Sequence, residues 1–79
     1  MIISDYQSAS SKSINSAGGL YEVGEGYSGY SGIYFVTYYE CHLIWKDSRM
    51  LASISKSAGS SMTLNPGGAN HSVYVKHYG

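Results

Sequence analysis

Residues Ile33 to Trp45 read Ile-Tyr-Phe-Val-Thr-Tyr-Tyr-Glu-Cys-His-Leu-Ile-Trp and decide the fold class of this chain. Taken alternately, one set of side chains is almost entirely apolar: Ile33, Phe35, Thr37, Tyr39, Cys41, Leu43 and Trp45. The other set is mixed: Tyr34, Val36, Tyr38, Glu40, His42 and Ile44. A period of two with one apolar side predicts a half-buried β-strand. We therefore expect one strand here, with the apolar set facing the core.

A straight strand of this length would span about 43 Å, which is longer than most strands. We expect a bulge or a strong bend near residues 40–42 for that reason. Residues 46–49 read as a tight turn, and residues 50–56 alternate again. This pattern predicts that residues 50–56 pair with the long strand as an antiparallel hairpin.

Other alternating segments lie at residues 20–23, 61–65 and 71–78, separated by Gly, Ser and Pro turns. In the turn Asn65-Pro66-Gly67-Gly68, Pro presets one position and Gly takes the positive φ. Several short strands without a helical pattern predict an all-β fold, a small antiparallel sandwich or barrel-like meander of about five strands. The expected core is Leu20, Val23, Ile33, Phe35, Leu43, Trp45, Ile54, Leu64, Val73 and Val75.

The chain divides into two parts by composition. Residues 1–19 are rich in Ser and poor in apolar groups, so they offer little to offset the entropy of ordering. We expect an N-terminal arm or linker there, although a short strand at its start and a short helix at residues 8–14 are alternatives. Residues 20–79 then form a single β-domain.

Charge is scarce in this sequence. The net charge is zero and charged residues make up 13% of the chain, about half of the usual share. The five Lys and Arg residues are scattered, whereas nucleic-acid binding needs them clustered. No apolar run is long enough for a membrane helix, and residues 1–3 do not resemble a signal peptide. We expect no nucleic-acid partner, no membrane insertion, and a location in a virion or the host cytoplasm.

The small size of the domain leaves its stability marginal, because a chain of 79 residues buries only about 60% of the surface that its unfolded chain exposes, less than a larger domain buries. A single Cys excludes an internal disulfide, and three His without a Cys pair give no zinc pattern. We predict no metal and no cofactor. Self-association is the remaining source of extra stability.

Two motifs invite a catalytic interpretation. Cys41 and His42 are adjacent, but neighbours on a strand point to opposite faces, so a dyad would need His71 or His77 from the last strand. Gly24 to Gly29 reads G-x-G-x-x-G, but a predicted strand follows it and not the helix that a dinucleotide site requires. We predict a protein without catalytic activity.

Tyr, Gly and Ser are in excess, a mixture that antibody binding sites use for recognition. Tyr27 and Tyr30 lie in a Gly-rich loop and are candidate contacts for a protein or a sugar. The strand tyrosines are candidates for an oligomer seam: Tyr34, Tyr38, Tyr74 and Tyr78. The alternative is that Tyr simply suits solvated strand faces.

One arrangement resembles a known class. Residues 18–25 read Gly-Gly-Leu-Tyr-Glu-Val-Gly-Glu, a Gly/Ser loop leads to Gly32-Ile33-Tyr34-Phe35-Val36, and residues 72–76 read Ser-Val-Tyr-Val-Lys. This resembles the small terminal β-domains of bacteriophage tail-fibre and other virion proteins. The resemblance implies a trimeric domain that binds a receptor or a glycan, and it assigns no functional residue.

Three hypotheses about function follow, of which an enzyme that uses Cys41 is ranked last. The first is a phage-type binding or structural module that self-associates and recognises a protein or glycan receptor. The second is a small phage or bacterial inhibitor that blocks a host protein.

Overall fold

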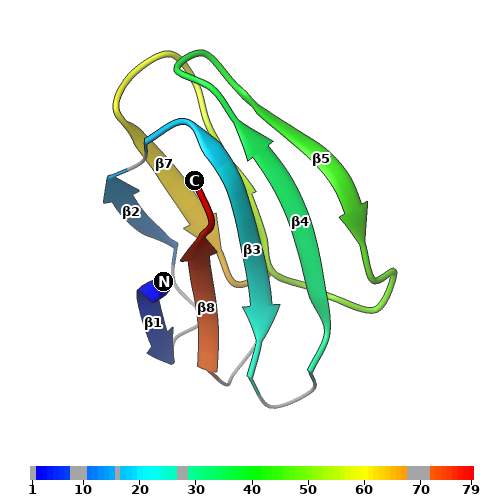
Figure 1. Cartoon of the computed structure of the whole chain (residues 1–79). Coiled ribbons are helices and arrows are strands. Elements are labelled where there is room, and N and C mark those ends of the chain that lie inside the picture. Colours follow the sequence, from blue (N-terminus) through cyan, green and yellow to red (C-terminus); the bar gives the residue numbers. More distant parts are fainter. Residues whose placement is uncertain (1, 8–10, 16, 27–28, 68–71) are drawn as a thin grey trace.

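The computed structural model describes residues 2–7, 11–15, 17–26, 29–67 and 72–79. Within them the chain forms strands only, arranged as two antiparallel sheets in two layers (Figure 1). The larger sheet contains, in spatial order, β1 (Ile2–Gln7), β8 (Ser72–His77), β3 (Gly19–Glu25), β4 (Ser31–Val36) and β5 (Cys41–Lys46). The smaller sheet contains, in spatial order, β2 (Lys12–Asn15), β7 (Ser61–Asn65) and β6 (Ser53–Ser55).

The predicted all-β, antiparallel, sandwich-like class is confirmed. The described chain differs in detail, with eight strands in place of about five and no closed barrel. Only β3, β4 and β5 follow one another as a meander, whereas β8 lies between β1 and β3.

The stretch that we expected to form one long strand is a hairpin. β4 ends at Val36, a turn covers residues 37–40, and β5 begins at Cys41. The Thr37 hydroxyl oxygen accepts hydrogen bonds from the backbone N–H groups of Tyr39 (3.3 Å) and Glu40 (3.2 Å). The Thr37 N–H donates to the Glu40 carbonyl oxygen at 2.8 Å. A hydroxyl that captures backbone donors in this way favours a turn over an extended chain.

The expected pairing of residues 50–56 with the long stretch is wrong. β5 pairs with β4, and β6 pairs with β7 in the other sheet. The chain leaves β5 through Asp47, whose carbonyl oxygen accepts from the Met50 N–H at 3.0 Å. Residues 47–52 carry the chain from β5 in one layer to β6 in the other. The turn after β7 agrees with expectation, since Gly67 has a φ of 67°.

Parts of the segment that we expected to be an arm, residues 1–19, are integrated into both sheets. β1 pairs with β8, with Asp5 opposite Tyr74, and β2 pairs with β7, with Ile14 opposite Met62. Ile14 is buried in the core. The two layers therefore both contain strands from the N-terminal quarter of the chain.

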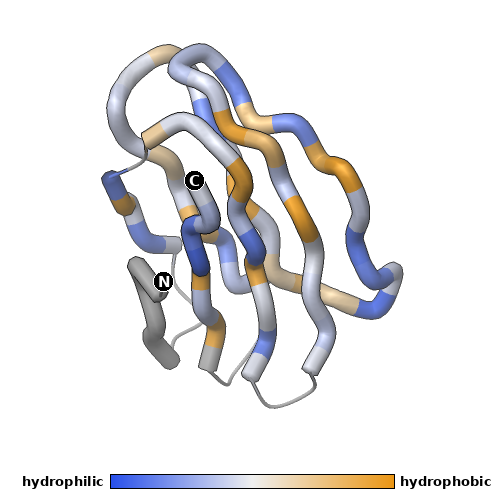
Figure 2. The backbone as a smooth tube through the Cα atoms, in the orientation of Figure 1, coloured by the Kyte–Doolittle hydropathy of each residue, from blue (hydrophilic) through white to orange (hydrophobic). Residues whose placement is uncertain are grey.

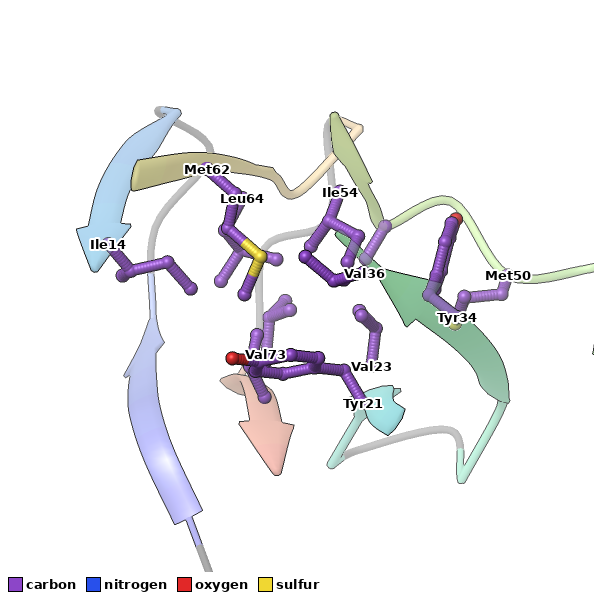
Figure 3. Packing of buried hydrophobic residues seen from close by; sticks show 12 residues of the cluster. Ile14, Tyr21, Val23, Tyr34, Val36, Met50, Ile54, Met62, Leu64 and Val73 are labelled. Carbon is purple, nitrogen blue, oxygen red and sulfur yellow. The ribbon is translucent and has the colours of Figure 1, made fainter. Parts of the chain in front are cut away.

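The core lies between the sheets (Figure 3). Five of the predicted core residues are buried: Val23, Ile54, Leu64, Val73 and Val75. The other members of the core are Ile14, Tyr21, Tyr34, Val36, Met50, Ala52 and Met62. The Tyr21 ring stacks on His77 with 4.3 Å between ring centroids, and its hydroxyl donates to the Ala17 carbonyl oxygen.

The remaining core predictions are wrong. Leu20, Phe35, Leu43 and Trp45 are exposed, and Ile33 is half-buried. The register explains the reversal: Val23 lies opposite Val75 and, two residues away, Tyr21 lies opposite Tyr34. Directly paired residues point to the same face. Burying the valines of β3 and β8 therefore carries Tyr21 and Tyr34 inward and turns Phe35 outward.

Candidate binding face

The outer face of the five-stranded sheet carries an ordered set of side chains. Glu22 lies opposite Lys76 on one side and Ile33 on the other, and Ile33 lies opposite Trp45. A second row crosses the same strands from Leu20 through Phe35 to His42. We call these residues the outer face: Leu20, Glu22, Ile33, Phe35, His42, Trp45, Tyr74, Lys76 and Tyr78.

Large apolar side chains on this face are open to solvent. Leu20 is 37% exposed, Phe35 43% and Trp45 56%. Figure 2 shows hydrophobic segments on both of the neighbouring strands β4 and β5. Monomeric soluble proteins rarely expose contiguous apolar patches of more than a few hundred Å², and larger patches mark sites of interaction. The outer face is therefore the strongest candidate for a binding surface.

A carboxylate held by two phenols borders the apolar rows. The Tyr78 hydroxyl donates to Glu22 Oε1 at 2.7 Å, and the Tyr74 hydroxyl donates to Glu22 Oε2 at 2.9 Å. The Tyr74 ring can reach Glu22 because it crosses Gly24, where a Cβ would lie 2.1 Å from the ring. Lys76 Nζ lies 5.0 Å from the centre of the same ring. Glu22 is thus fixed in one position with an aromatic ring and a cation beside it.

This environment changes the acidity of the phenols. Burial, followed by the hydrogen bond to Glu22 and its negative charge, raises the pKa of Tyr74 to about 12. The pKa of Tyr78 is also raised, chiefly by its hydrogen bond to Glu22. Both phenols are therefore neutral donors at physiological pH, and Glu22 accepts from both.

The turn and the edge next to this face are also apolar. Tyr38 and Tyr39 in the β4–β5 turn are exposed, with their rings in edge-to-face contact at 5.0 Å. β5 is the last strand of its sheet, and Leu43 and Ile44 on it are exposed. The register shifts between Ile33 and Tyr34, so β5 carries a bulge at this point. Bulges and charges are the usual protection of an edge strand, and β5 has this bulge together with Lys46 at its end.

The five tyrosines predicted as contacts occupy different environments. Tyr74 lies on the outer face, and Tyr38 is exposed in the β4–β5 turn. Tyr30 is half-buried against the core, with the Arg49 guanidinium 4.5 Å from its ring centre. Tyr34 is 5% exposed and is a core residue, so no partner can reach it. Tyr27 lies outside the described residues.

The alternation identified the outer-face residues Phe35 and Trp45 as a set but assigned them to the interior. The sequence analysis did not identify Glu22 as a residue of a binding face. One sequence feature could have indicated it: Glu22 lies between Tyr21 and Val23, whose side chains are buried, so alternation places Glu22 on the opposite face. Only the contact between β3 and β8 brings Tyr74 and Tyr78 to it.

Cys41 and His42 do not form a dyad. Cys41 lies opposite Val36 and its thiol contacts the Ile54 carbonyl oxygen at 3.5 Å, while His42 lies opposite Phe35. Burial raises the pKa of the Cys41 thiol, which disfavours the nucleophilic thiolate. His42 Nε2 lies 3.0 Å from Glu40 Oε1 at the surface. Among the described residues, no three His, Cys, Asp or Glu side chains gather as a metal site.

The described residues include no helix that is long and apolar enough to cross a membrane. No family model matches the chain, and no curated protein and no solved structure matches it. The outer face is therefore interpreted from its own chemistry.

Proposed function

We propose that this chain is a non-catalytic binding module that recognises a protein surface through the outer face of its five-stranded sheet. The observation that carries the proposal is the exposure of Leu20, Phe35 and Trp45 on one side of that sheet. Aromatic residues enriched in the centre of a patch, with polar residues around it, are typical of protein interfaces. Here Glu22, Lys76 and His42 provide the polar surround.

A second copy of the chain is the first partner that we propose. A typical stable interface buries about 800 Å² per partner, roughly a fifth of the 4324 Å² that this chain exposes. The face carries both signs of charge in Glu22 and Lys76, so it can be complementary to itself about a symmetry axis. Covering the apolar rows would also stabilise a chain too small for a large core.

The resemblance to tail-fibre domains extends the proposal. It would make the chain a phage-type structural or receptor-binding module, in a virion or in the host cytoplasm, with a trimer as its assembly. The outer face supports the self-association in that proposal, because its exposed apolar side chains could form the contact surface between copies of the chain. The phage origin itself stays a prediction from the sequence.

The single Trp makes the proposal directly testable. Trp45 is half-exposed in the monomer, so covering the outer face should shift its fluorescence emission to shorter wavelength. We expect this shift to develop as protein concentration rises, together with a doubling or tripling of mass in light scattering. Phe35→Thr keeps a strand-forming residue but removes the ring, and we expect it to weaken association about tenfold or more.

The matched control is Tyr39→Thr, which removes an exposed ring from the β4–β5 turn and not from the face. It should leave association unchanged. A mass that stays monomeric at millimolar concentration, with constant Trp45 emission, would contradict self-association.

A monomer would favour the second candidate, an inhibitor that binds another protein. The observation in its favour is the edge strand β5, where Leu43 and Ile44 are exposed. Edge strands bind extended segments of other proteins by adding a strand. An added strand would change the amide signals of β5 residues first, whereas a face contact would change the Trp45 side chain.

A further inference from the structure

A concave surface lies on the smaller sheet, in the layer opposite the five-stranded sheet that carries the outer face. A hollow of about 340 Å³ opens at the end of the β6–β7 hairpin and is lined by Ser55, Lys56, Ser57, Ser61, Met62 and Thr63. Four of these residues carry a hydroxyl, and Met62 is buried beneath them. Its size is at the lower end of the range for small-molecule sites.

Lys56 is held in place at this hollow. Its ammonium group donates to the carbonyl oxygens of Gly59 and Ser61, the latter at 3.1 Å. An ammonium group has three N–H donors, and these two carbonyl oxygens accept from two of them. The two carbonyl oxygens also offset part of its positive charge, which makes the site a weaker one for simple anions.

An exposed aromatic ring borders the same hairpin. The Gly59 N–H donates to the Tyr38 carbonyl oxygen at 3.1 Å, which joins the β6–β7 loop to the β4–β5 turn. Lys56 Nζ lies 5.9 Å from the centre of the Tyr38 ring. Tyr38 is 60% exposed, so part of its ring is accessible to solvent beside Lys56.

The outer side of the smaller sheet continues the polar lining. Thr63 lies opposite Ser13 on one side and Ser55 on the other, so a row of hydroxyls crosses all three strands. Asn65 Nδ2 donates to Ser55 Oγ at 3.2 Å and Ser11 Oγ donates to Asn65 Oδ1 at 2.9 Å. β2, β6 and β7 contain no Asp or Glu. The surface therefore offers many neutral donors and acceptors and no negative charge.

We propose that this hollow binds one sugar unit of a glycan. Sugar hydroxyls donate and accept hydrogen bonds, and Ser and Thr hydroxyls do the same by rotating. The third N–H of Lys56 would donate to a ring or hydroxyl oxygen, and the face of Tyr38 would cover the C–H groups of the sugar. This site is additional to the proposed function, because it lies on the other sheet and uses none of the outer-face residues.

The test is a titration of the ¹⁵N-labelled chain with the methyl glycosides of glucose, galactose, mannose and N-acetylglucosamine, and with inorganic phosphate. We expect at least one sugar to shift the amide signals of residues 55–63, with a Kd on the order of millimolar, as is usual for a single small ligand with a few hydrogen bonds. Thr63→Val keeps the shape of the side chain and removes its hydroxyl, and it should weaken binding about tenfold. Lys56→Met should do the same by removing the ammonium donors.

Two controls make the result specific. Ser48→Ala removes a hydroxyl from the turn after β5 and should leave sugar binding unchanged, as should Phe35→Thr on the outer face. Signals that respond to phosphate alone, or to none of these probes, would overturn the sugar site. Sugar binding that survives both Thr63→Val and Lys56→Met would overturn it as well, and none of these outcomes bears on association through the outer face.

Discussion

At the scale of single residues, Glu22 and its two tyrosines show how a surface acquires a fixed geometry. A carboxylate on a strand is ordinarily mobile and solvated. Here Tyr74 and Tyr78 each donate to one of its oxygens, and Gly24 leaves the space that Tyr74 crosses. The sequence separation between Glu22 and Tyr78 is over fifty residues, so no local pattern indicates the contact.

We predict that Tyr74 makes the chain lose stability at alkaline pH. Its pKa is about 12 in the folded chain against 10.0 ordinarily, because of burial and the hydrogen bond to Glu22. Above pH 10 the unfolded chain releases this proton while the folded chain retains it, so the free energy of unfolding falls as pH rises from 10 to about 12. Below pH 10 both states hold the proton and the contribution is constant.

The measurement is urea unfolding of the wild type and of Tyr74→Phe across this pH range. The wild type should lose stability with a steeper slope, since the pKa values of Tyr21, Tyr34 and Tyr78 are raised in both proteins and contribute equally. The variant is expected to be less stable at neutral pH, because it lacks the hydrogen bond to Glu22. Parallel slopes for the two proteins would contradict the assignment to Tyr74.

At the scale of elements, the β4–β5 hairpin is formed by its turn. The four residues before Thr37 and the eight after it alternate well enough to be read as one strand. The Thr37 hydroxyl nevertheless accepts from two backbone N–H groups and donates to the Glu40 carbonyl oxygen. That arrangement satisfies the backbone of a tight turn. The β5 edge and the exposure of Trp45 both depend on it.

We predict that Thr37→Val destabilises the chain by about 1 kcal/mol, the usual net value of hydrogen bonds lost without a change of shape. Thr37→Ser retains the hydroxyl and should cost less, so it is the matched control. Thermal or urea unfolding measures both. A loss for Thr37→Ser as large as that for Thr37→Val would contradict the role of the hydroxyl, because Ser retains it.

At the scale of the whole molecule, one buried carboxyl ties the two layers together. Glu25, at the end of β3 in the larger sheet, is 2% exposed. Its Oε2 accepts from the Leu51 N–H at 2.7 Å and the Ala52 N–H at 2.8 Å, in the segment that leads into β6 of the smaller sheet.

We predict that Glu25→Ala leaves these two N–H groups without their acceptor and destabilises the chain by about 3 kcal/mol, from about 1–3 kcal/mol for each unsatisfied group. This is a large share of the roughly 4–12 kcal/mol expected for a domain of this length. Glu25→Gln keeps an amide oxygen in place of the carboxyl and should lose less. Urea unfolding at neutral pH is the measurement. A stability of Glu25→Ala within about 0.5 kcal/mol of the wild type would contradict the proposed role of Glu25 in joining the two layers.

The sequence by itself determined the all-β class, the antiparallel pairing, and the inward side of β8, because a period of two and the turn residues are local properties. Val73 and Val75 are inward as predicted, and β7 has the predicted bounds. Of the predicted contact residues, Tyr38 and Tyr74 were placed at accessible positions, whereas Tyr34 was not.

Only the tertiary structure decided which face of Ile33–Trp45 is buried. Alternation separates two faces but does not say which one another sheet will cover. The smaller sheet covers one side of the larger sheet, and the register of β3 with β8 and β4 turns Tyr21, Val23, Tyr34 and Val36 toward it. Phe35 and Trp45 face outward for that reason. The register that completes the core therefore also leaves the most apolar face of Ile33–Trp45 open to a partner.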